Sequence, residues 1–170
     1  MDVWTSGNIT LICGNSYRLI DNYRGIATAI IADPPYGISL STNRRERGWS
    51  NLAECHDFAP IEGDDRPFDP APFLGFPIVV LFGGNYFADK LPPSPGWIVW
   101  DKLHGLHGSR EFGFCDMADV ELIWTNIDRP ARLVRHRWMG MIKDSEHTES
   151  RVHPTQKPIA LMETLVRPCP

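Results

Sequence analysis

The sequence predicts an α/β fold built on an open sheet. Several short runs rich in β-branched and aromatic residues have the continuous apolar pattern of strands that are covered on both faces. Each of these runs ends in small or polar residues, and shorter helical connections are expected between them. Ligands of open α/β sheets bind at the carboxyl ends of the strands, so the residues after each run are the first candidates for a functional site.

The first predicted elements are a strand and the helix that follows it. The apolar run ITLIC over residues 9–13 is closed by Gly14 and Asn15, which are typical of a turn. A helix is expected over residues 16–23, because Ser16 is a good N-cap residue.

The rest of the chain divides into further strands, one long irregular segment and a final helix. Strands are predicted over residues 27–32, 77–82, 97–100 and 119–124. Residues 133–138 are expected to pair with the last of these strands as a hairpin arm. Periodicity disappears over residues 38–76, which we interpret as a long loop or insertion. Residues 159–166 are amphipathic and predict a helix.

Composition indicates a single globular domain over residues 1–170. The chain is 42% hydrophobic and 11% aromatic, which is enough for a core. No apolar run approaches the length of a membrane span and the first residues lack the pattern of a secretion signal, so a cytoplasmic protein without a membrane partner is expected. The four cysteines form no Cys-x-x-Cys pair and the six histidines show no ligand spacing, so no metal site is predicted.

The charged residues are unevenly distributed along the chain. A net charge of −4 argues against a protein that coats nucleic acid by electrostatics alone. Arginines are nevertheless gathered in two stretches, which either give one face a positive field or are ordinary solvated charges. On the first interpretation, the residues expected to contact DNA are Arg44, Arg45, Arg47, Arg135 and Arg137.

The stretch IIADPPYG ends the strand over residues 27–32 in an unusual way. An ionised Asp33 offers only acceptors and proline has no N–H, so Asp33, Pro34 and Pro35 form a stiff array of lone pairs. Its complement is a group with two N–H donors, such as the amine of adenine or cytosine. Acceptors on both N–H bonds stabilise the positive charge that grows as this nitrogen attacks a methyl group.

Tyr36 follows this acceptor array directly. A tyrosine at this position is suited to stack on a base that has been flipped out of a duplex, a contact worth about 1–3 kcal/mol. The purely structural alternatives are a turn cap for Asp33 and a core position for Tyr36.

Two motifs carry a resemblance to a known family. The sequence DPPY at residues 33–36 resembles the catalytic motif of DNA methyltransferases that modify the amino group of adenine (N6) or cytosine (N4). The sequence HPTQKP at residues 153–158 is similar to the His-Pro-x-x-Lys-Pro segment that precedes the methionine-binding part of the fold in circularly permuted members. Residues 83–87 and 100–102 resemble short methyltransferases of bacteriophages and prophages.

The resemblance implies a Rossmann-like methyltransferase fold with a mixed, mostly parallel open sheet. It also implies S-adenosylmethionine as methyl donor and a flipped DNA base as acceptor, in a bacterial or phage-infected cell. Asp rather than Ser at the first motif position favours N6 of adenine over N4 of cytosine. The implied catalytic residues are Asp33, Pro34, Pro35 and Tyr36. The implied cofactor-binding residues are Asn15, Asp33, His153, Thr155, Gln156 and Lys157, with Lys157 near the cofactor carboxylate.

The resemblance breaks after residue 166, where the permuted family continues with a glycine-rich cofactor loop. Two strands in the middle of the family's sheet are therefore expected to be missing, and the strand before Asp33 is expected to expose an edge. Three interpretations stay open: completion by a second polypeptide, an inactive copy, or a homo-oligomer that covers the edge. Weak cofactor binding by this chain alone is expected. The functional alternatives are a non-catalytic DNA-binding subunit and methylation of RNA or of a protein amide.

Overall fold

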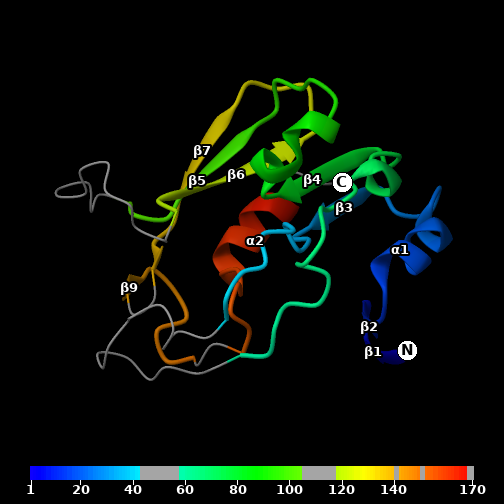
Figure 1. The fold of residues 1–170 in the computed structure, drawn as a ribbon, viewed down its shortest axis with the longest axis horizontal. Coiled ribbons are helices and arrows are strands. Elements are labelled where there is room, and N and C mark those ends of the chain that lie inside the picture. Colours follow the sequence, from blue (N-terminus) through cyan, green and yellow to red (C-terminus); the bar gives the residue numbers. More distant parts are fainter. Residues whose placement is uncertain (43–57, 105–117, 140–141, 150–151, 168–170) are drawn as a thin grey trace.

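The computed structural model describes residues 1–42, 58–104, 118–139, 142–149 and 152–167. Its centre is a five-stranded sheet with the order β3-β4-β6-β5-β7 (Figure 1). The strands are β3 (Ala29–Ala32), β4 (Ile78–Phe82), β5 (Ile98–Asp101), β6 (Val120–Thr125) and β7 (Arg132–Arg135). The predicted α/β class and mixed open sheet are therefore present.

Strand direction decides which residues meet at the rim of this sheet. β3 is parallel to β4 and β5 is parallel to β7, whereas β6 is antiparallel to both β4 and β5. β3, β4, β5 and β7 consequently end at one rim. Because β6 runs in the opposite direction, its first residues lie at that same rim.

Smaller elements surround the sheet. A hairpin of β1 (Asp2–Ser6) and β2 (Ile9–Cys13) precedes α1 (Ser16–Leu19) and the 3₁₀ turn η1 (Ile20–Tyr23). Two further 3₁₀ segments, η2 (Ala71–Phe73) and η3 (Gly84–Lys90), flank β4 in sequence. A short pair, β8 (Trp138–Met139) and β9 (Ile142–Lys143), precedes α2 (Ile159–Val166). No helix in these described segments is long and apolar enough to cross a membrane.

The core lies on both faces of β4, which explains its continuous apolar sequence. On one face, Val80 and Phe82 share a cluster with Leu161 of α2, the red helix against the sheet in Figure 1. On the other face, Val79 and Leu81 belong to a second cluster. The further buried members of this second cluster are Ile20, Phe68, Phe73, Phe76, Phe87 and Trp124. Burying both faces of a strand in this way is typical of the central strand of an α/β sheet.

The N-terminal region differs from the prediction in two respects. Asn15, not Ser16, is the N-cap of α1, because the Asn15 Oδ1 atom accepts a hydrogen bond from the Tyr17 N–H at 3.0 Å. The expectation that Gly14 and Asn15 share the rim of the main sheet is wrong. Their strand, β2, pairs with β1 in a separate two-stranded sheet, and the sequence reading had not identified β1 as a strand.

The structure also tests the predictions for residues 133–138 and for the segment over residues 38–76. The predicted hairpin of residues 133–138 with β6 is wrong: β7 pairs in parallel with β5, because β6 already has a neighbour on each side. Within residues 38–76, the described part is irregular apart from η2, as expected, but Phe68, Phe73 and Phe76 are buried in the core. β3 lies at one end of the strand order, as the sequence predicted.

Candidate functional site

The candidate site is built where β3 ends. Asp33 follows the last residue of β3 directly, and Pro34 and Pro35 stop the strand because neither has an N–H to extend a ladder. Gly83 follows β4, and Glu121 stands at the start of the reversed strand β6. Residues from three neighbouring strands therefore converge on one part of the rim.

The carboxylate of Asp33 is held by two donors from within the protein. Its Oδ1 atom accepts a hydrogen bond from the Tyr36 hydroxyl at 2.9 Å, and its Oδ2 atom accepts one from the Lys157 ammonium at 2.8 Å. Lys157 lies 124 residues further along the chain, in the turn before α2. The Lys157 side chain is 9% exposed and that of Asp33 is 27% exposed, so the ion pair is largely shielded from solvent. The two sequence motifs thus meet at this contact.

A second carboxylate, that of Glu121, lies on the other side of the same ammonium. The Oε2 atom of Glu121 is 3.4 Å from Lys157 Nζ, and Oε1 is 3.2 Å from Lys102 Nζ. Glu121 Oε2 is buried and accepts no hydrogen bond from the described residues. Lys157 Nζ also lies 5.1 Å from the centre of the Phe82 ring, within the range of a cation–π contact. One ammonium therefore stands between two carboxylates at the edge of the core.

The Tyr36 ring is stacked rather than free. Its centroid is 4.9 Å from that of Tyr86, and the two ring planes differ by 15°. Burial, followed by the negative charges of Asp33 and Glu121, raises the pKa of the Tyr36 phenol far above its usual range, so the hydroxyl stays a neutral donor to Asp33. Tyr86, at 48% exposure, is the outer ring of this stack. The aromatic wall that the sequence predicts for a base carries a second aromatic ring in this structure.

Glycine and aspartate residues fix the backbone around Tyr36. Gly83 has a φ of +68°, and a Cβ atom at this position would collide with the Tyr36 ring. Asp64, which is 4% exposed, accepts hydrogen bonds from Gly37 N at 2.8 Å and Leu40 N at 2.7 Å. The chain after Tyr36 and the space beside its ring are therefore fixed by residues outside the DPPY motif.

The predicted cofactor-binding residues mostly contact their own neighbours. Asn15 caps α1 on the N-terminal hairpin. In the turn before α2, Thr155 donates from its N–H to His153 Nδ1 at 3.3 Å, and Gln156 Oε1 accepts from the Val152 N–H at 3.0 Å. These contacts shape the turn that delivers Lys157 to Asp33. Of the predicted set, the structure brings Asp33 and Lys157 together, whereas Asn15 belongs to a separate hairpin region.

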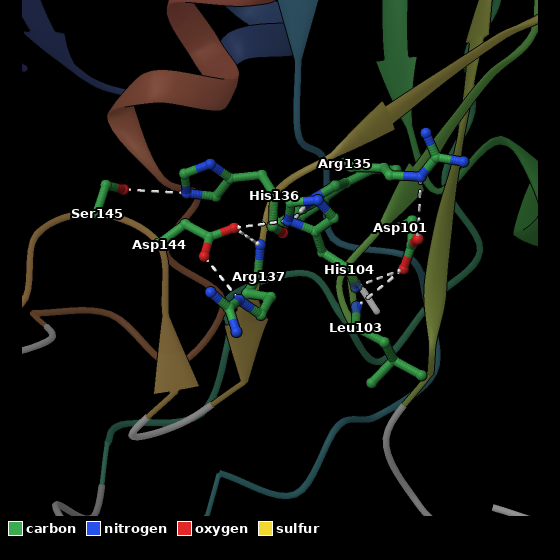
Figure 2. A network of polar contacts seen from close by, with 9 residues as sticks. Asp101, Leu103, His104, Arg135, His136, Arg137, Asp144 and Ser145 are labelled. Carbon is green, nitrogen blue, oxygen red and sulfur yellow. Dashed lines mark hydrogen bonds and ion pairs between the residues drawn. The ribbon is translucent and has the colours of Figure 1, made fainter. Parts of the chain in front are cut away.

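The arginines predicted to contact DNA have different environments. Arg44, Arg45 and Arg47 lie outside the described residues. Arg135 is 58% exposed, and its Nε atom is 3.9 Å from Asp101 Oδ2 (Figure 2). Arg137 instead donates to the Asp144 carboxylate from both its backbone N–H and its Nε, each at 2.7 Å. Of Arg135 and Arg137, only Arg135 has a side chain that is mostly exposed to solvent.

Figure 2 shows why Arg137 is committed to this contact. Asp144 accepts hydrogen bonds from Arg137 and lies 3.3 Å from the Nδ1 atom of His104. Burial alone would raise the pKa of Asp144, but the hydrogen bonds from the Arg137 N–H, the Arg137 guanidinium and His104 outweigh it and lower the pKa to about 2. A carboxylate that is ionised over almost the whole pH range thus ties the end of β5 to the segment after β7.

Comparison of the chain with protein-family models, curated proteins and solved structures found no match. Among the described residues there is also no group of three or more His, Cys, Asp or Glu side chains that could hold a metal ion.

Sequence reasoning missed three residues of this site: Glu121, Tyr86 and Asp64. A signal existed for Glu121, because a glutamate interrupts the apolar run DVELIW. Its position at the rim follows only from the reversed direction of β6, which a single sequence does not reveal. Asp64 accepts hydrogen bonds from backbone N–H groups, and Tyr86 stacks on Tyr36, which is distant in the sequence. Neither contact leaves a local pattern in the sequence.

Proposed function

We propose that this chain forms the amino-group-binding side of a DNA adenine N6 methyltransferase that uses S-adenosylmethionine. The observation that carries the proposal is the meeting of Asp33 and Lys157 at 2.8 Å, because it joins two motifs that were singled out independently in the sequence. The partly exposed carboxylate at a strand end and the stacked Tyr36 ring support the same function. Open α/β sheets bind their ligands at such a rim.

Each residue has a defined part in this proposal. The Asp33 carboxylate and the Pro34 carbonyl accept the two N–H bonds of the base, and the stacked pair of Tyr36 and Tyr86 supplies an aromatic surface for a base that has left the duplex. Accepting both N–H bonds stabilises the positive charge that grows on the nitrogen as it gains a methyl group. At least one of the two donors that now occupy Asp33 has to give way to the amine. Cytosine presents an equivalent amine, so N4 methylation is the alternative on the same chemistry.

The methyl donor requires further residues, since Asn15 caps α1 and the side chains of His153 and Gln156 accept hydrogen bonds from backbone N–H groups of their own turn. We propose that a second polypeptide or a second copy of this chain supplies them by pairing with β3. β3 has one neighbour, β4, in the described sheet, and an unpaired strand edge is a template for a further strand.

A second candidate function is a DNA-binding subunit with no activity of its own. The local backbone contacts of Asn15, His153 and Gln156 favour it, as does the occupation of both Asp33 oxygens by donors from the protein. In this candidate the rim is a remnant that retains contacts to DNA through exposed arginines such as Arg135.

Transfer of a labelled methyl group from S-adenosylmethionine to unmethylated genomic DNA separates the two candidates. The proposal expects N6-methyladenine after hydrolysis of the DNA to nucleosides, its loss in Asp33→Ala, and its retention in Asp21→Ala, an exposed aspartate outside the site. N4-methylcytosine as the product would move the assignment to the other base. Absence of any product from the wild type, alone or with a partner chain, would support the subunit.

A further inference from the structure

The Lys157 ammonium has a second carboxylate within reach that it does not fully use. Lys157 Nζ donates to Asp33 Oδ2 at 2.8 Å, and Glu121 Oε2 lies 3.4 Å away without a hydrogen bond from the described residues. A buried carboxylate oxygen without a donor is costly, typically by about 1–3 kcal/mol. The Lys157 ammonium therefore has two acceptors in reach: Asp33 Oδ2, to which it donates, and Glu121 Oε2, which has no hydrogen bond from the described residues.

We propose that Lys157 is a switch between these two carboxylates. In the resting state it neutralises Asp33. When the amino group of a base approaches, the ammonium turns to Glu121 Oε2 and leaves Asp33 Oδ2 to accept the amine N–H. This inference rests on the proposed function, because it specifies how Asp33 becomes free for an amino group. Glu121 is then a positioning residue, which acts on the base through Lys157.

The charges of the site make this exchange feasible. A lysine ammonium that is 9% exposed cannot be left without a partner, because an unpaired buried charge is strongly unfavourable. Glu121 provides that partner, because its Oε2 atom already lies within ion-pair distance of Lys157 Nζ, at 3.4 Å. The centre of the Phe82 ring lies 5.1 Å from Lys157 Nζ, so a cation–π contact adds to the stabilisation of the ammonium.

The exchange also serves the chemistry of the proposed reaction. An ammonium bound to Asp33 cancels the negative charge that would stabilise a developing positive charge on the base nitrogen. Transfer of the ammonium to Glu121 restores that charge only when an amine is present to use it. A ligand with a carbonyl oxygen in place of the amine presents an acceptor to Asp33 at that position, so this group cannot displace Lys157. The switch thus selects for an amino group.

Binding of adenosine and inosine to the purified protein tests the switch, because the two nucleosides differ in having an amine or an oxygen at the same position. The wild type is expected to bind adenosine more tightly. Glu121→Gln removes the charge that receives Lys157, so adenosine affinity should fall by about tenfold while inosine affinity is unchanged. The double variant Glu121→Gln/Lys157→Met has no ammonium on Asp33 and should recover adenosine binding. A variant that merely disturbs the fold would show no such recovery.

Lys102→Met is the matched control, since it removes the other ammonium from Glu121 and leaves Lys157 in place. The switch predicts adenosine binding that is no weaker than in the wild type. A preference for adenosine that Glu121→Gln leaves unchanged overturns the switch and leaves the proposed function standing. Equal binding of both nucleosides by the wild type, or binding of neither, overturns the proposed function and the switch with it.

Discussion

The N-terminal hairpin and the central sheet each contain a mainly apolar strand, but the two strands differ in burial. β2 has the sequence ITLIC and β4 has the sequence IVVLF, and both are five residues long. Leu11 of β2 is 58% exposed, whereas Leu81 of β4 is fully buried. The apolar sequence of each strand is sufficient for an extended conformation, but burial depends on what the rest of the chain brings to each face.

The ion pairs of the two regions also differ in how far they are exposed to solvent. Around the sheet rim, the Asp33, Glu121 and Lys157 side chains are 27%, 20% and 9% exposed, so their charges interact in a partly desolvated setting. In the N-terminal region, Asp21 and Arg24 form an equally short ion pair, but their side chains are 74% and 40% exposed. Charge interactions strengthen as water is removed, which makes the rim the part of the molecule suited to chemistry.

The largest effect that tests this comparison is expected from Leu81→Ala. Truncation of a fully buried leucine leaves a cavity between packed layers and should lower the free energy of unfolding by about 2–5 kcal/mol. The matched variant Leu11→Ala, in the exposed hairpin, should change it by less than about 0.5 kcal/mol. Urea denaturation followed by circular dichroism measures both. Similar losses in the two variants would mean that the hairpin is covered in solution.

The second test replaces a glycine in each region. Gly83 and Gly7 both have positive φ angles, of +68° and +55°, but only at Gly83 does an added Cβ meet another residue, the Tyr36 ring. Gly7→Ala should therefore cost only the backbone strain, about 1–2 kcal/mol. Gly83→Ala adds displacement of a packed ring, for a total of about 2–4 kcal/mol.

Thermal unfolding compares these two variants directly. If Gly83→Ala is no more destabilising than Gly7→Ala, the Tyr36 ring moves aside at little cost and Gly83 does not fix its place. A larger loss in Gly83→Ala would show that the stack of Tyr36 on Tyr86 is part of the folded core.

The sequence was sufficient to predict the parts of the fold that have a local signature. The continuous apolar runs identified β3, β4, β5 and β6, and the amphipathic pattern identified α2. β1 was missed because the five residues DVWTS form neither a continuous apolar run nor a strict alternation of polar and apolar residues. The pairing of β7 was also missed, because it depends on which edge of the sheet is open and no local pattern records that.

The candidate site depends even more on long-range contacts that local sequence patterns do not reveal. The DPPY and HPTQKP motifs were visible as local patterns, but their contact across 124 residues was not, and Lys157 was expected near a cofactor rather than on Asp33. Glu121 reaches the rim because β6 runs against its neighbours. Residues that act through long-range contacts or through backbone donors are therefore the ones that a single sequence hides.

The smallest expected effect distinguishes two ion pairs that have the same Nε–carboxylate distance. Asp144 and Asp21 each accept a hydrogen bond from an arginine Nε at 2.7 Å, but the Asp144 side chain is 21% exposed and that of Asp21 is 74% exposed. The folded-state pKa of Asp144 is about 2, below its ordinary value of 3.8, so ionised Asp144 stabilises the folded state above the higher value. This contribution is lost as the pH falls from about 5 to about 2, because the carboxylate becomes protonated.

Asp144→Asn should therefore lower the free energy of unfolding by about 1–2 kcal/mol at neutral pH and by almost nothing near pH 2. Asp21→Asn should change it by less than about 0.5 kcal/mol at any pH, because solvent screens an exposed pair. Urea titrations of the wild type and both variants at several pH values measure the difference. A pH-independent loss in Asp144→Asn would mean that the carboxylate acts through packing rather than charge. Equal losses in the two variants would mean that the lower exposure of Asp144 and its further contacts in Figure 2 add nothing to the hydrogen bond from the arginine.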